Sequence, residues 1–251
     1  MIGKPMGDTA EQMKIAIALK DAILDAYDPE AIILFGSLGR GDADEFSDVD
    51  LLIVMEADRD VKELSEEMAE LLDHITRDKH TIVRTAENFC RHMDIPGTLA
   101  FSAKTEGLIL FEKTGWLTRH IPTHSYDVRK KEVMRQEYAE SAHGFLAQAQ
   151  SACQNQNLFR CRDFLRFAAA RAIKGFFVKE NIVPPRETDL EELLEKARQM
   201  EPDLMRHKLF IEEVNDYCPG KTDSEERRRC HELVERTSKF LNEILIKYHV
   251  H

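Results

Sequence analysis

Two pairs of residues near the start of the chain have side chains suited to binding a metal ion and a phosphate group. Asp48 and Asp50 stand two residues apart, and Gly36 directly precedes Ser37. Adjacent carboxylates repel each other, a cost that a bridging divalent cation commonly offsets. Gly36 allows the backbone to approach an anion closely, and the Ser37 hydroxyl can donate a hydrogen bond to it. A phosphate cradle beside metal-binding carboxylates is the apparatus of phosphoryl or nucleotidyl transfer.

Short apolar segments on either side would position these residues. Residues 31–35 and 51–55 are apolar runs bounded by glycine and aspartate, a pattern typical of buried strands. On a strand, side chains two residues apart point to the same face, so we expect Asp48 and Asp50 to project together. Gly36 lies in a turn that opens a helix, where free backbone N–H groups would also face a phosphate.

The chain divides into two parts of different texture. Apolar residues at near-helical spacing predict a helix over 9–26, and further strands are expected at 81–83 and 107–112. Strands alternating with helices indicate a small α/β domain, which we place at 1–115. Beyond about residue 125 only long amphipathic segments follow, so the expected second domain, 116–251, is an all-helical bundle of about five helices.

Composition narrows the class of protein. No apolar run approaches a membrane span, and the first residues contain no apolar signal-peptide segment, so we expect a cytoplasmic protein without membrane contact. The five cysteines are odd in number and never spaced as Cys-x-x-Cys, which argues for a reducing compartment and against a zinc site. A net charge of −11 disfavours broad nucleic-acid binding, which depends on Lys and Arg.

The first motif resembles that of a known family. Gly36-Ser37, ten further residues and then Asp48-Val49-Asp50 resemble the signature of the DNA polymerase beta-like nucleotidyltransferase superfamily. The longer strings 36–41 (Gly-Ser-Leu-Gly-Arg-Gly) and 47–51 (Ser-Asp-Val-Asp-Leu) are similar to its minimal nucleotidyltransferase branch. The resemblance implies the nucleotidyltransferase fold, a small mixed sheet with helices.

The resemblance also implies roles for individual residues. Asp48 and Asp50 would hold one or two Mg²⁺ ions on a nucleoside triphosphate, while Gly36 and Ser37 would bind its β and γ phosphates. Arg40 is a candidate for a further phosphate contact, because guanidinium matches phosphate oxygens. The alternative for Arg40 is a solvated arginine in a turn.

A third carboxylate on the next strand normally completes the family's site, and here the sequence departs from the pattern. Aligning 85–89 with the end of that strand puts His80 at the expected position. A neutral imidazole could act as a base or a metal ligand, but it supplies no negative charge. Asp78 would take the position if the strand register shifted, and Asp94 and Glu106 are more remote candidates.

The helical half resembles a HEPN domain, a helical domain often found beside minimal nucleotidyltransferases. Four segments carry this resemblance: 162–177, Pro184-Pro185, 189–194 and 217–220. HEPN ribonucleases carry Arg and His about five residues apart on a late helix. The pair Arg119 and His124 has this spacing, but it lies in the Pro-containing linker between the expected domains, so we interpret it as a chance match. A nuclease is therefore not expected.

Two functions follow from these motifs. The first is an enzyme that moves a nucleoside monophosphate from an NTP to a hydroxyl acceptor, either a small molecule such as an aminoglycoside or a protein. The second is an NTP-binding regulatory or antitoxin-type module that transfers weakly or not at all, because the third carboxylate is missing. A homodimer through helical faces is a further expectation.

Overall fold

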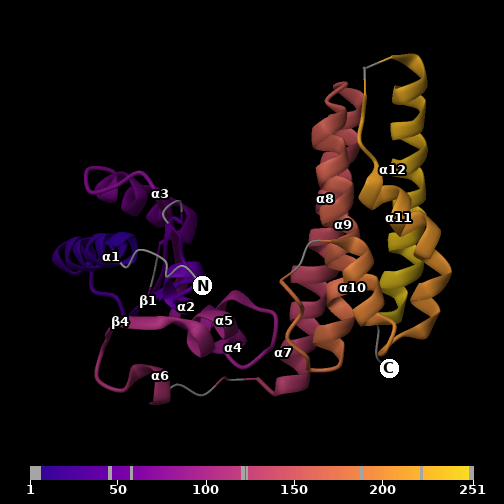
Figure 1. Cartoon of the computed structure of the whole chain (residues 1–251). Helices are drawn as coiled ribbons and strands as arrows, with labels where there is room; N and C mark the ends of the chain where they lie inside the picture. Colours follow the sequence, from indigo (N-terminus) through magenta and orange to yellow (C-terminus); the bar gives the residue numbers. More distant parts are fainter. Residues whose placement is uncertain are drawn as a thin grey trace. The chain divides into compact units, whose positions relative to one another are not determined.

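The computed structural model describes residues 7–44, 47–56, 59–119, 122, 124–186, 189–220 and 223–248. The chain forms two compact units (Figure 1). The first runs to Asp94 and resumes over Thr98–Ser125, and the second combines Ile95–Gly97 with the chain from Tyr126 onward. Among the described residues, no helix is both long and apolar enough to cross a membrane.

A four-stranded mixed sheet forms the centre of the first unit. Its strands are β1 (Ala31–Phe35), β2 (Val49–Met55), β3 (Lys79–Thr85) and β4 (Leu108–Glu112), in the spatial order β3-β2-β1-β4. The β2–β3 pair is parallel, whereas β1 pairs antiparallel with both β2 and β4. Two of the strands, β1 and β2, are almost wholly buried, as their apolar runs predict.

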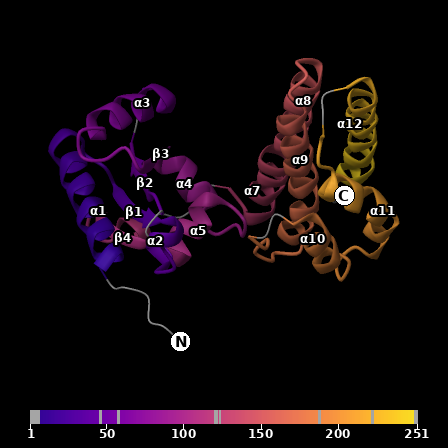
Figure 2. The ribbon, with the colours of Figure 1, turned by 45° about the horizontal axis from the view of Figure 1, so that its top comes forward.

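Alternation along the central strands gives the sheet two apolar faces. Leu51 and Ile53 of β2 pack in a core with α1 (Gly7–Ala26) and α3 (Val61–Leu72). Leu52 and Val54 share the other core with α4 (Ala86–His92), α5 (Leu99–Glu106) and the short helix α6 (Trp116–Arg119). Figure 2 shows α1 and α3 on one side of the strands and α4 and α5 on the other.

The third strand is longer than its apolar residues suggest. The sequence predicts a strand at 81–83, whereas β3 begins at Lys79 and ends at Thr85. Backbone pairing with β2 extends the strand, because Lys79 pairs with Val49 and His80 with Asp50 at its polar end. A ladder needs only backbone groups, so polar side chains at a sheet margin do not end it.

The second unit is helical throughout its described secondary structure. A nearly continuous helical stretch comprises α7 (Tyr126–Val133), a π-helical segment (Met134–Glu140) and α8 (Ser141–Gln154). It is followed by α9 (Leu158–Lys179), α10 (Leu190–Ala197), a 3₁₀ segment (Pro202–His207), α11 (Lys208–Asp216), α12 (Ser224–Leu245) and a final 3₁₀ turn (Ile246–Tyr248). Several helices begin at side-chain caps: Asn157, Asp189 and Asp223 each accept a backbone N–H of the first turn.

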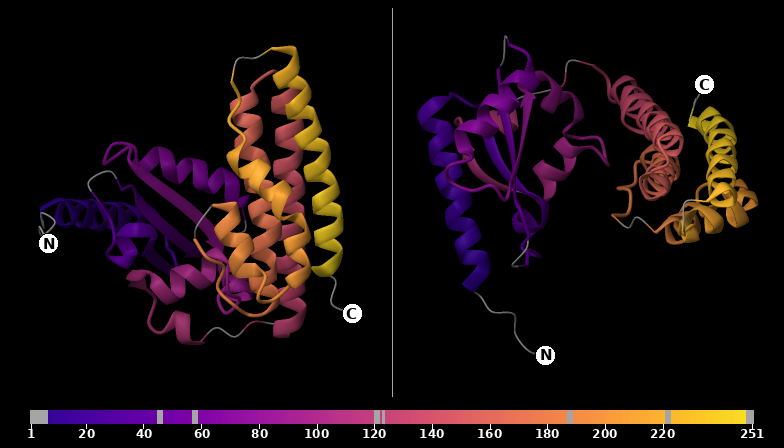
Figure 3. Two further views of the ribbon diagram at one scale, coloured as in Figure 1. Left: turned by 45° about the vertical axis from the view of Figure 1, so that its right-hand side comes forward. Right: turned by 90° about the horizontal axis from the view of Figure 1, so that it is seen from above.

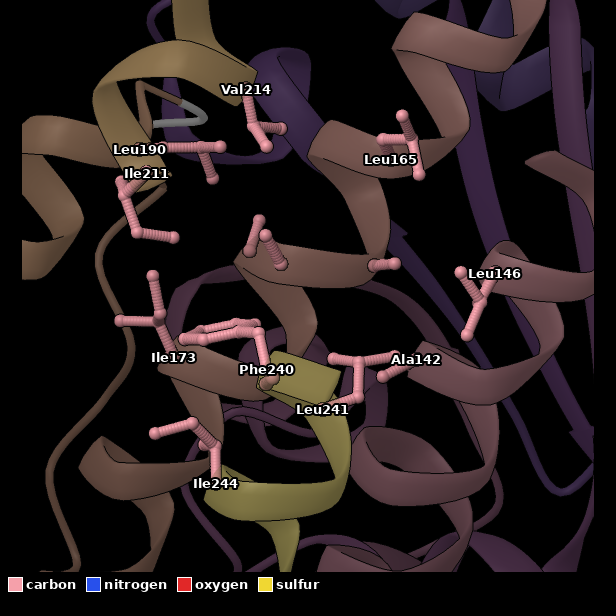
Figure 4. Close-up of a cluster of buried hydrophobic side chains, with 14 of the residues drawn as sticks. Ala142, Leu146, Leu165, Ile173, Leu190, Ile211, Val214, Phe240, Leu241 and Ile244 are labelled. Atoms are coloured by element: carbon pink, nitrogen blue, oxygen red, sulfur yellow. The ribbon is translucent and has the colours of Figure 1, made fainter. Parts of the chain in front are cut away.

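One apolar core joins these helices. Helices α8, α9 and α12 run side by side (Figure 3). Between them lie side chains that include Leu146 of α8, Leu165 and Ile173 of α9, and Phe240 and Leu241 of α12 (Figure 4). The fold class expected from the sequence, a small mixed sheet with helices followed by an all-helical bundle, is confirmed.

Candidate active site

Gly36 and Asp50 are in close contact. Strand β1 ends at Phe35, and the short helix α2 (Gly36–Arg40) begins at the next residue. Gly36 has φ +67°, a conformation that side chains with a Cβ rarely adopt, and a Cβ built there would lie 2.0 Å from Oδ2 of Asp50. Only glycine lets the carboxylate occupy this position. The Gly36-Ser37 turn and the aspartate of β2 are therefore in direct contact.

The sheet register brings these residues together. Phe35 of β1 pairs with Asp50 of β2, so the chain leaves β1 beside the aspartate. Asp48 lies just before β2 and is exposed, while Asp50 is half-buried in the strand. Burial is the largest influence on the pKa of Asp50 and raises it; the Asp48 charge raises it as well, and His80 lowers it. The two carboxylates therefore repel each other, as their spacing predicts.

His80 is the residue of β3 that faces Asp50. The two are partners in the parallel ladder, and Nδ1 of His80 lies 3.5 Å from Oδ1 of Asp50. The His80 side chain is 64% exposed, so an external molecule can reach it. Asp78 lies before the strand, where its carbonyl accepts the Val49 N–H at 3.2 Å.

The more remote acidic candidates lie on other elements. Asp94 follows α4, and Glu106 is the last residue of α5. After burial, the neighbours that act on the pKa of Asp50 are His80, Asp48 and Arg40. In this register an imidazole occupies the position opposite Asp50 on β3.

Helix α2 carries the two candidate phosphate-binding side chains. Ser37 is half-buried in the first turn, and its carbonyl accepts the Asp42 N–H at 3.0 Å. The Arg40 guanidinium pairs with Asp42, with its Nε 3.3 Å from Oδ2 and an Nη 3.2 Å from Oδ1. Arg40 also lowers the pKa of Asp50, so its charge acts on the site. Arg40 is thus an ion-paired residue whose charge acts on Asp50.

Gln12 is a contributor that the sequence gives no reason to select. From α1, its Nε2 donates to the carbonyls of Asp44, at 2.9 Å, and Ser47, at 2.8 Å. The Ser47 hydroxyl in turn donates to Oδ1 of Asp44 at 2.8 Å. The bonded residues are 32 and 35 positions from Gln12, too far apart for any local pattern. Gln12 therefore ties α1 to Asp44 and Ser47, two residues that shortly precede Asp48 in the chain.

The donor set fits a hard divalent cation. Asp48 and Asp50 provide carboxylate oxygens, the ligands that Mg²⁺ prefers. Their mutual repulsion and the burial of Asp50 both favour a cation beside them. Gly36 allows the Asp50 carboxylate to lie directly against the turn of α2.

One protein-family model matches most of the first unit. Residues 18–114 match the family model described as Polymerase beta, Nucleotidyltransferase. No curated protein sequence matches the chain significantly. The match spans all four strands, the glycine turn and both aspartates.

Two solved structures resemble the chain more weakly. A nucleotidyltransferase-like protein from Exiguobacterium sibiricum 255-15 has 14% identity and a TM-score of 0.42, over 94% of this chain and 77% of that one. Spectinomycin adenyltransferase from Enterococcus faecialis, solved with ATP and spectinomycin, has 10% identity and a TM-score of 0.48, over 91% and 99%. At these values the two structures add nothing to the family match. Residues 18–114 are thus similar to the nucleotidyltransferases of the polymerase beta type.

Proposed function

We propose that the protein is a Mg²⁺-dependent nucleotidyltransferase that moves a nucleoside monophosphate from an NTP to a hydroxyl acceptor and releases pyrophosphate. The observation that carries this proposal is the packing of the Asp50 carboxylate against the bare Cα of Gly36, within a domain that matches the family model. That contact couples a carboxylate suited to metal binding to the turn suited to phosphate binding.

Each residue of the site has a role in this proposal. Asp48 and Asp50 hold the cation, which supplies charge neutralisation for the phosphates when it is bound. The Ser37 hydroxyl donates to a phosphate oxygen, and Gly36 lets this turn lie against Asp50, so that phosphate and cation would be held side by side. Arg40 can exchange its contact with Asp42 for a phosphate, which guanidinium binds in the same two-pronged manner.

His80 is the proposed proton acceptor. In its neutral form an imidazole can take the proton from an attacking hydroxyl. Its exposed side chain is reachable by an acceptor, and its position 3.5 Å from Asp50 keeps the proton transfer close to the metal ligands. Asp50 orients the ring through the same contact.

The second candidate function is an NTP-binding regulatory or antitoxin-type module with little or no transfer. It is favoured by the histidine at the position facing Asp50, because a neutral imidazole adds no negative charge for a second cation. Both functions require binding of an NTP with Mg²⁺, and they differ in turnover.

The acceptor and the helical half complete the proposal. We propose either a polycationic small molecule of the aminoglycoside type or a protein hydroxyl as the acceptor, and the net charge of −11 would attract a cationic one. The helical bundle is proposed to be HEPN-like, on the four sequence segments that resemble that domain. The acceptor class that stimulates pyrophosphate release, a cationic small molecule or a protein, identifies the acceptor.

Pyrophosphate release in Mg²⁺, with each NTP and acceptor class, tests the main proposal. We expect Asp50→Asn to lower the rate at least about a hundredfold, as for loss of a principal electrostatic group in an active site. The matched control is Asp25→Asn, an exposed carboxylate at the end of α1. An unchanged rate in Asp50→Asn refutes the proposed site.

A second substitution separates the two functions. If wild type binds the Mg²⁺ complex of an NTP without turnover, and His80→Asp restores pyrophosphate release, the regulatory function is supported. His74→Asp makes the same charge change at an exposed histidine after α3 and serves as the control. Because ligand binding stabilises a folded protein, the absence of any melting-temperature shift with an NTP and Mg²⁺ refutes both functions.

A further inference from the structure

Three buried thiols converge in the helical unit. Cys153 of α8, Cys161 of α9 and Cys230 of α12 place their sulfur atoms within 4.8 Å of one another. The sulfurs of Cys161 and Cys230 are 3.1 Å apart, and all three thiols are free. The spacing of these cysteines in the sequence matches no metal motif, so only the packing of three helices reveals the cluster.

Two buried oxygens accompany the thiols. The Tyr217 hydroxyl and Oε1 of Glu226 are both buried and lie close to each other, and Tyr217 is only 2% exposed. Burial chiefly raises the pKa of Tyr217, and the Cys230 thiol and the Glu226 carboxylate, which also raise it, lie close enough to act on it. Cysteines that pack merely as small apolar side chains need no polar neighbours.

We propose that Cys153, Cys161 and Cys230 bind one thiophilic, closed-shell metal ion, Cu⁺ or Zn²⁺. Thiolates are soft ligands that select these ions over Mg²⁺. With metal–sulfur bonds of about 2.3 Å, three sulfurs around one ion stand about 4 Å apart, which the observed cluster accommodates. Cu⁺ is satisfied by three thiolates, whereas Zn²⁺ requires a fourth ligand. The Glu226 carboxylate, whose Oε1 is buried and which lies beside Tyr217, is a candidate for it.

Binding of the metal ion would release the protons of the three thiols. A thiol binds such an ion as a thiolate, so each of the three buried cysteines must lose its proton when the ion binds. Three thiols that become thiolates release three protons for each ion bound, and no oxidant is needed. The bound ion would join α8, α9 and α12 at one point. We therefore expect it to raise the melting temperature of the helical unit.

Metal titration of the full-length reduced chain tests the proposal without any nucleotide, so its failure is distinct from failure of the proposed transferase. Cu⁺ and Zn²⁺ are added separately against competing chelators, in a weakly buffered solution that records proton release. We expect one ion per chain, with a dissociation constant on the order of nanomolar or tighter, as for structural zinc sites. The tighter ion identifies the cation. No stoichiometric binding of either ion, or a Cys161–Cys230 disulfide in place of an ion, overturns the proposal.

Cysteine variants and alkylation of the wild-type protein together show which thiols bind the ion. Cys161→Ala and Cys230→Ala should each abolish stoichiometric binding, whereas Cys90→Ala, a buried cysteine of the first unit, should retain it. Because the first two variants can also fail to fold, alkylation of wild type provides an independent measurement. The ion should slow modification of the three clustered thiols and leave Cys90 unaffected. Binding that survives in the cluster variants, or that slows Cys90 instead, overturns the assignment.

Discussion

Replacement of Gly36 by alanine tests the contact on which the candidate site depends. The added Cβ would lie 2.0 Å from Oδ2 and 2.9 Å from Cγ of Asp50, whereas real Cβ contacts stay above 3.0 Å. The carboxylate must therefore move by at least about 1 Å, or the α2 turn must shift away from it. A displacement of this size at a reacting centre can cost about a hundredfold in rate.

Backbone strain accompanies the displacement and must be measured separately. A non-glycine residue in the left-handed region costs on the order of 1 to 2 kcal/mol. Gly41 offers a matched control, because it has φ +79° and a Cβ there meets nothing within 4 Å. Gly41→Ala therefore imposes the strain without the displacement.

Three measurements on the two variants decide the matter. Denaturant unfolding should show a loss of at least 1 to 2 kcal/mol in Gly36→Ala and a loss of about that size in Gly41→Ala. Only Gly36→Ala should lose about a hundredfold in pyrophosphate release and most of its melting-temperature shift with Mg²⁺ and an NTP. Equal activity in the two variants would refute the reasoning, because the displaced carboxylate would then be irrelevant to function.

Three further predictions concern Gln12, which contacts the segment before Asp48, the cap of α10 at Asp189, and the half-buried Asp50. Gln12→Ala should lower pyrophosphate release about tenfold and the free energy of unfolding by about 1 kcal/mol, because its two hydrogen bonds to the carbonyls of Asp44 and Ser47 are lost. The control Lys14→Ala removes an exposed side chain of the same helix and should change neither quantity. Full activity in Gln12→Ala would contradict the role of Gln12 in positioning the segment before Asp48. Asp189→Ala should lower the free energy of unfolding by about 1 kcal/mol at pH 7. The hydrogen bond from the Glu192 backbone N–H is the main cause of the lowered pKa of Asp189, so the stabilisation by the cap is lost as pH falls through that pKa. The difference in free energy of unfolding between wild type and Asp189→Ala should therefore shrink between pH 5 and pH 3. A difference that stays constant over this range would count against the cap. Asp50→Asn should raise the free energy of unfolding at pH 7 without Mg²⁺. Burial raises the pKa of Asp50, so ionisation of this carboxyl costs stability as pH rises through that pKa, and asparagine avoids the cost. Equal stability of wild type and Asp50→Asn in urea at pH 7 would disprove this prediction.

Much of the fold can be predicted because its signals are local. The apolar runs at 31–35 and 51–55 are strands because buried strands need continuous apolar side chains. The helical texture beyond residue 125 likewise comes from short-range periodicity. The third strand is longer than predicted, since its polar end at Lys79 and His80 is held only by pairing with β2.

The candidate site divides in the same way. The spacing of Asp48 and Asp50, and the presence of Gly36 and Ser37, identify the chemistry from side-chain types alone. The position of His80 opposite Asp50 depends on the parallel register of β2 and β3, which no local pattern encodes. Gln12 has no sequence signal at all, because its partners lie more than thirty residues away.

The sequence by itself determined which side chains could bind a cation and a phosphate and which segments would form strands or helices. Only the tertiary structure decided that the Gly36 turn lies against Asp50, that an imidazole faces it, and that three distant cysteines meet in the bundle. The physical reason is the range of the interactions. Side-chain chemistry and periodicity act within a few residues, whereas strand register and helix packing join residues far apart in the chain.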